Sequence, residues 1–123
     1  MKTALLLIAH GSRNADANLD LIALAEDLRR NGPYPIVESA FLELASPNIE
    51  SAARQCMNQG AERLILTPYF LSAGIHVKRD LQAHRDRINQ EFPTVEVLLA
   101  QPLGPHLLLR EIVLQRAQSA AGE

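Results

Sequence analysis

The sequence predicts an α/β domain: a four-stranded parallel sheet with helices on both faces. Four short apolar segments alternate with four segments of helical periodicity, in the order βαβαβαβα. The first apolar segment, Ala4 to Ala9, has no polar residue, which is typical of a strand buried on both faces. Strands connected through helices lie parallel to one another. We therefore expect one α/β domain over residues 1–123.

The first helix and the second strand are predicted from periodicity and from the residues that end them. Apolar residues recur at helical spacing from Asp16 to Arg30. Asn31-Gly32 marks the end of this helix, and Pro33 blocks its continuation. The next apolar segment, Ile36 to Leu42, predicts the second strand.

A serine and a proline predict the start of the second helix. Ser46 is expected as the N-cap, and Pro47 as the first helical residue. This helix should end near Asn58. The third strand is expected from Arg63 to Thr67, followed by a loop from Pro68 to Ile75.

The last third of the chain predicts one more strand between two helices. The third helix is expected from Val77 to Glu91, and the fourth strand from Val95 to Ala100. The segment Gln101 to Pro105 should form the last loop. The final helix carries apolar residues in its first two turns and is expected to fray from Ser119 to Glu123.

Composition excludes several classes of protein. The net charge of −2 gives no global sign of the basic surface that a nucleic-acid-binding protein needs, and no apolar run reaches the roughly 20 residues of a membrane span. The single cysteine, Cys56, excludes an intramolecular disulfide and a cysteine metal cage. The first apolar run leads directly into His10, so we interpret it as a strand rather than a signal peptide and expect a cytoplasmic protein. Neither a Gly-x-Gly-x-x-Gly motif nor a Walker A loop is present.

Three residues with metal or proton chemistry follow three of the predicted strands. His10 directly follows the first strand, Glu43 ends the second, and His76 ends the loop after the third. Ligands bind beyond the carboxyl ends of the strands in open α/β sheets, so these residues should meet at one edge. Histidine titrates near neutral pH and binds metals, and a carboxylate completes a metal site or accepts a proton. Taken singly, each could instead be a loop hydrogen-bonding residue or a helix cap.

Cations and a glycine near this edge indicate an anionic, flat ligand. Lys78 and Arg79 fall in the predicted first turn of the third helix, where cations are favourable if an anion binds there. Arg13 in the first loop adds a third positive charge, although ordinary surface charge is the alternative. Gly74 either adopts a positive φ or leaves room for the ligand. Ser12 lacks the Gly-x-Ser-x-Gly setting of a nucleophile and is assigned to substrate binding.

The two other histidines lack this support. His84 lies in the middle of the third helix among charged residues and is expected on a solvated face. His106 opens the last helix, where it should cap the helix or lie on the surface, although it could border the site.

Four stretches carry a family resemblance. They span nearly the whole chain in order: LIAHGSR from Leu7, FLELASP from Phe41, PYFLSAGIHVKRD from Pro68 and PLGPH from Pro102. In these stretches the chain resembles the small, single-domain class II chelatases of the CbiX type, the sirohydrochlorin cobalto- and ferrochelatases. The third stretch is the most specific. One departure is mild: Leu107 stands where the family often has proline.

The resemblance implies an activity and a set of site residues. It implies a lyase that inserts a divalent metal, Co²⁺, Fe²⁺ or Ni²⁺, into sirohydrochlorin on the way to cobalamin or sirohaem. The family's active-site histidines correspond to His10 and His76, and its glutamate to Glu43. The metal is a substrate, so no permanent cofactor is expected. Larger relatives carry two such domains, so the resemblance implies a homodimer.

Two rival functions stay open at this point. A histidine phosphatase also places a histidine after its first strand, but its chemistry resembles Arg-His-Gly, and here Ala9 precedes His10. A metal or tetrapyrrole carrier needs similar residues and differs only in the absence of turnover.

Overall fold

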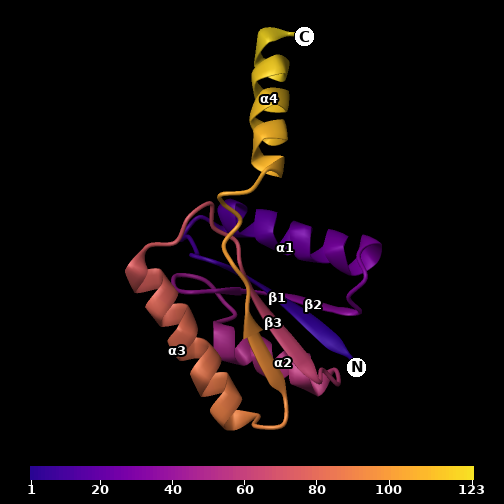
Figure 1. The fold of residues 1–123 in the computed structure, drawn as a ribbon, viewed down its shortest axis with the longest axis vertical. Coiled ribbons are helices and arrows are strands. Elements are labelled where there is room, and N and C mark those ends of the chain that lie inside the picture. The colour runs from indigo at the N-terminus through magenta and orange to yellow at the C-terminus, as the bar shows by residue number, and fades with distance from the viewer.

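The computed structural model describes residues 1–123 and contains four strands and four helices in strict alternation (Figure 1). The strands are β1 (Thr3–Ala9), β2 (Ile36–Phe41), β3 (Arg63–Pro68) and β4 (Glu96–Leu99). The helices are α1 (Ala15–Asn31), α2 (Ile49–Asn58), α3 (Ile75–Glu91) and α4 (Leu108–Ala121).

The strands form one parallel sheet in the order β2-β1-β3-β4. All the carboxyl ends therefore lie at the same edge, with the end of β1 between those of β2 and β3. Ala9 at the end of β1 is in register with Phe41 of β2, and Ile8 is in register with Pro68 of β3. The predicted four-stranded parallel sheet is confirmed.

Helices cover the two faces of the sheet unequally. On one face, α2 and α3 enclose the larger core, a cluster of 14 buried residues that includes Leu6, Leu64 and Leu81. On the other face, α1 packs against β1 and β2 around a smaller cluster of five buried residues, among them Leu7 and Leu21. Cys56 is fully buried on α2, and burial, reinforced by the charge of Glu38, raises the pKa of its thiol to about 12. This cysteine is a core residue.

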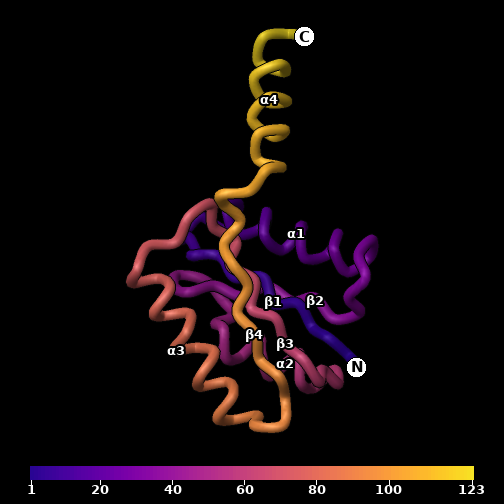
Figure 2. The backbone as a smooth tube through the Cα atoms, viewed as in Figure 1, coloured from indigo at the N-terminus to yellow at the C-terminus, as the bar shows by residue number.

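The last helix stands apart from the rest of the molecule. α4 contains no buried residue, and the ribbon and tube views show it projecting from one end of the α/β body (Figures 1 and 2). It continues to Ala121, so the expected fraying from Ser119 is wrong. No helix of the protein has the length and apolar character that a membrane span requires.

The two helix starts nearest the site differ from the prediction. α2 begins at Ile49, and its N-cap is Asn48, whose side-chain oxygen accepts a hydrogen bond from the amide of Ser51 at 2.9 Å. Ser46 is not the cap, because the carbonyl of Pro47 still accepts from the amide of Phe41 in the loop. α3 begins two residues earlier than predicted, at Ile75.

Candidate active site at the carboxyl edge of the sheet

His10 and Glu43 form a pair just beyond the ends of β1 and β2. His10 Nε2 lies 2.7 Å from Glu43 Oε1, and each side chain is 58% exposed. The pairing of the two strands continues past their ends, because the amide of Leu42 donates to the carbonyl of Ala9 and the amide of Glu43 to that of His10, both at 3.0 Å. The backbone ladder itself therefore holds the two side chains together.

Gly11 allows the first loop to approach the second this closely. Its φ is +100°, and a Cβ placed on it would lie 1.8 Å from the carbonyl oxygen of Glu43. A side chain would therefore both strain the backbone and push the loops apart. Sequence reasoning did not single out Gly11, although its place directly after His10 was the available signal.

The loop that carries Glu43 is tightly curled. Its end returns to its start, since the carbonyl of Pro47 accepts from the amide of Phe41 at 3.0 Å. Within it, Leu44 has a φ of +66°, a conformation that non-glycine residues seldom adopt and that often marks functional sites. Leu44 is also 52% exposed, so it adds an apolar side chain to the surface beside the pair.

Polar contacts hold the first loop in place. Asn18 brackets Ser12: its side-chain oxygen accepts from the amide of Ser12 at 3.0 Å, and its Nδ2 donates to the carbonyl of Ser12 at 2.8 Å. The hydroxyl oxygen of Ser12 accepts from the amide of Asn14, which is the N-cap of α1. Ser12 thus has a scaffolding role. Arg13 is exposed in the same loop.

His76 does not join the pair in this structure. It is exposed, and it is the second residue of α3 rather than the end of the loop. No group of three histidine, cysteine or acidic side chains lies close enough to hold a metal ion. The expected cluster of His10, Glu43 and His76 is therefore absent from this structure.

Gly74 precedes α3 as its N-cap and has an ordinary φ of −70°, so of its two predicted roles the positive φ is wrong. A Cβ on Gly74 would meet no atom within 4 Å, which leaves open space above this end of the helix. Because α3 begins at Ile75, Lys78 and Arg79 are its fourth and fifth residues. Arg79 thus lies beyond the first turn, contrary to the prediction, and the Lys78 amide already donates to the carbonyl of Gly74.

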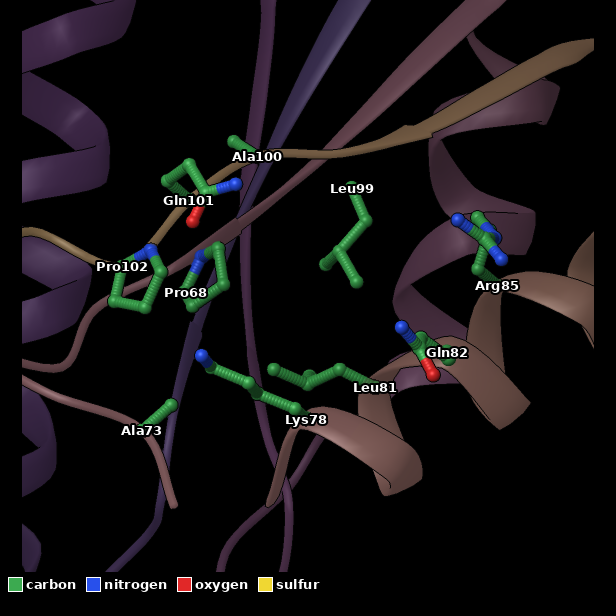
Figure 3. Close-up of a pocket in the computed structure, with 10 residues that line it drawn as sticks. All are labelled: Pro68, Ala73, Lys78, Leu81, Gln82, Arg85, Leu99, Ala100, Gln101 and Pro102. Carbon is green, nitrogen blue, oxygen red and sulfur yellow. The ribbon is translucent and has the colours of Figure 1, made fainter. Parts of the chain in front are cut away.

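A polar pocket of about 220 Å³ lies between α3 and the end of β4 (Figure 3). Lys78 extends its amino group toward Pro68 and Pro102, and Arg85 lies at the opposite end. Arg79 does not line this pocket. Arg85, which was not among the predicted site residues, follows Lys78 by seven residues, or two helical turns, and so lines the same pocket.

A second histidine–glutamate pair lies between α2 and α3, away from this edge. His84 Nδ1 is 2.6 Å from Glu50 Oε1, and their side chains are only 19% and 23% exposed. Arg87 Nε donates to the same carboxylate oxygen at 3.1 Å. Burial alone would raise the pKa of Glu50, but its contacts with His84, its own backbone amide and Arg87 together lower it below the usual value. The expected solvated position of His84 is wrong.

His106 precedes Leu107, the N-cap of α4, and its side chain binds the first amide of the helix. Its Nδ1 accepts from the amide of Leu108 at 3.1 Å, as one of the two sequence interpretations proposed.

Comparisons with known proteins bear on the family and the fold of this chain. The CbiX family model matches residues 4–120. The chain is 38% identical to the chloroplastic sirohydrochlorin ferrochelatase of Arabidopsis thaliana over 93% of its residues and 51% of the relative. It is 30% identical to the sirohydrochlorin cobaltochelatase of Sulfolobus acidocaldarius over 94% of its residues and 90% of that protein.

Among solved structures, SirB from Bacillus subtilis with Fe³⁺ superposes with a TM-score of 0.88 at 30% identity. That match covers 98% of this chain and 48% of SirB. The chain thus spans about half the length of several of its relatives. The family model covers nearly the whole chain, and the solved relative shares its fold. The chain therefore belongs to the CbiX family.

Proposed function

We propose that this protein is a sirohydrochlorin chelatase that inserts a divalent metal ion into its tetrapyrrole substrate. The open His10–Glu43 pair carries the proposal, since it places a nitrogen ligand and a carboxylate 2.7 Å apart at the ligand-binding edge. The names of the relatives, which are ferrochelatases and cobaltochelatases of sirohydrochlorin, support this substrate.

Insertion exchanges two pyrrole N–H protons for one divalent ion, so the site must accept protons as well as present the metal. A carboxylate only accepts hydrogen bonds, so Nε2 of His10 donates to Glu43. In the neutral ring, Nδ1 then keeps the free lone pair. We assign Nδ1 as the atom that binds the incoming metal or takes a pyrrole proton. Glu43 stabilises the imidazolium that results and relays the proton to solvent.

The residues around the pair are assigned to metal delivery and substrate binding. His76, on the first turn of α3, serves as a second metal ligand that acts once the macrocycle is bound. Lys78, Arg79 and Arg13 hold the peripheral carboxylates by charge-assisted hydrogen bonds. The loop that contains Ser12 is held in place by Asn18 and contacts the flat ring, for which the open space at Gly74 leaves room.

Three further expectations belong to the same proposal. The metal, Co²⁺, Fe²⁺ or Ni²⁺, is a substrate. The imidazole and carboxylate ligands proposed for it suit all three ions. The SirB structure with Fe³⁺ supports iron, and the named cobaltochelatases support cobalt. We also propose that the protein acts as a homodimer in the cytoplasm, which remains a prediction.

A multiple-turnover assay tests the proposal. Purified protein is mixed anaerobically with excess sirohydrochlorin and each metal in turn, and the absorbance change on insertion is followed. The expected result is a rate above the protein-free control over many turnovers for at least one metal. A single stoichiometric binding event would identify a carrier. No acceleration with any metal would contradict the proposed activity.

Substrate binding has its own test. Lys78→Gln should raise KM with kcat nearly unchanged, because the contact to a peripheral carboxylate is the same in the ground and transition states. An unchanged KM would remove Lys78 from the binding site.

A further inference from the structure

One half of one sheet face has no helix over it. Val37, Leu5, Ile65 and Leu98 form a row across the four strands, on the side of the sheet that α1 covers. Val37 is fully buried, Leu5 and Ile65 are half-buried, and Leu98 is 40% exposed. Exposure rises along the row because α1 packs mainly against β2 and β1.

The row on the opposite face provides the comparison. Ile36, Ala4, Leu64 and Val97 are the corresponding residues, and the first three are at most 2% exposed, with Val97 packed against the same core. Parallel sheets are normally covered on both faces, because each face is apolar. The β3–β4 half of the α1 face therefore lacks a covering element.

The helix that could cover it projects elsewhere. α4 follows β4 directly, yet it has no buried residue. Its apolar residues recur at helical spacing, with Leu109 followed by Ile112, Val113, Ala117 and Ala120, and Ile112 and Val113 are 49% and 64% exposed. A helix with such a stripe is stable when the stripe is buried against another element.

The connection between β4 and α4 directs the helix outward. The amide of Leu103 donates to the carbonyl of Phe70 at 2.8 Å. Gly104 passes so close to the β3–α3 loop that a Cβ on it would lie 2.3 Å from the carbonyl oxygen of Leu71. These contacts hold the β4–α4 connection against the β3–α3 loop of the same chain. α4 therefore projects outward instead of folding back over β3 and β4.

We propose that α4 of one copy packs on the uncovered β3–β4 face of a second copy, and that the second copy's α4 packs reciprocally on the first. This deepens the proposed homodimer by assigning its interface. The exposed area supports it: 7931 Å² is roughly 1,400 Å² more than a compact chain of this mass exposes. Burying that excess in both copies removes about 2,800 Å², which is in the range of obligate homodimers.

Two variants of the full-length protein test the interface by mass in solution. Wild type should be a dimer by light scattering at micromolar concentration. Ile112→Glu with Val113→Glu should be a monomer, because it places two charges in the apolar stripe. Gln115→Glu with Gln118→Glu makes the same charge change on the polar side of α4 and should remain a dimer. A monomeric wild type, or a dimer that survives the first double variant, would overturn the proposal.

Cross-linking distinguishes the reciprocal packing of α4 between two copies, here called the exchange, from other arrangements. Cys56 is fully buried, so engineered thiols on the surface react selectively. Leu98→Cys and Val113→Cys, purified separately and then mixed, should give a covalent dimer with a short bismaleimide. Dimers from Val113→Cys alone would indicate that two α4 helices pair with each other. An internal cross-link in the double cysteine variant, without a covalent dimer, would indicate that α4 folds back on its own chain. Either outcome would contradict the exchange.

The readout here is mass, so it is independent of the proposed chelatase activity. A protein that cross-links as described but inserts no metal would refute the activity alone. A monomer that still turns over sirohydrochlorin would refute the exchange alone.

Discussion

Two histidine–glutamate pairs of nearly equal length lie in different surroundings. His10 and Glu43 are 2.7 Å apart and 58% exposed, whereas His84 and Glu50 are 2.6 Å apart and about one-fifth exposed. The first pair has no further partner, and the second is completed by Arg87. The difference teaches that residue type and distance do not define a site. The first pair is exposed and can still bind another group, so it is available for chemistry. The second pair is largely buried and already bound to Arg87, so it links α2 to α3.

The largest change in the open pair should come from Gly11→Ala. The new Cβ would clash with the carbonyl of Glu43, so the loops must separate and His10 must move relative to Glu43. Misplacement of catalytic groups by about 1 Å can cost on the order of 100-fold in rate, and we expect a loss of at least that size. Insertion rates and urea denaturation would measure it.

Gly74→Ala is the matched control for the stability of that variant. Its φ is ordinary and its Cβ would meet no atom, so stability should not change. Normal insertion by Gly11→Ala would show that the close approach of the two loops is unnecessary.

Glu43→Gln should have the next largest effect on rate. It keeps the size of the side chain but removes the charge that orients His10 and stabilises the imidazolium, and changes of this kind cost roughly 10–100-fold. Folding should be unaffected, because the side chain is exposed. Glu50→Gln makes the same change in the His84–Glu50 pair and should insert metal at the wild-type rate. Equal losses in both variants would remove the distinction between the pairs.

His84→Ala should lower stability without lowering activity. It removes a partly buried partner of Glu50 and so should cost about 1–3 kcal/mol of unfolding free energy. Arg30→Ala, in an exposed pair with Glu26, should cost well under about 1 kcal/mol. Urea midpoints would compare the two, and equal costs would contradict a stabilising link at His84.

The smallest expected effect is on acid stability. Because the pKa of Glu50 is lowered in the folded protein, its contribution to stability is present above the ordinary carboxyl value of 4.5 and is lost as the pH falls below it. Glu50→Gln should therefore show a shallower loss of stability on acidification than wild type. Parallel stability curves for the two proteins would argue against this assignment.

Much of the fold could be predicted because its signals are local. The unbroken apolar run ending at Ala9 and the helical spacing after Asp16 depend on residues that are neighbours in sequence. The edge that holds His10 and Glu43 followed from topology alone, since parallel strands end together.

The missed features depend on contacts between distant segments. His84 was placed on a solvated face because its partner, Glu50, lies 34 residues away on another helix. The outward direction of α4 depends on Gly104 passing the carbonyl of Leu71. The need for glycine at position 11 could be seen only in three dimensions, because it arises from the close approach of the Glu43 loop.

The most direct test of the central claim is the insertion rate of His10→Ala and His84→Ala, measured side by side with excess sirohydrochlorin and the preferred metal. The open pair should carry the chemistry, so His10→Ala should lose roughly 100-fold or more, with wild-type stability, while His84→Ala should insert at the wild-type rate despite its lower stability. If His10→Ala retained the wild-type rate, the open pair would not be the catalytic centre.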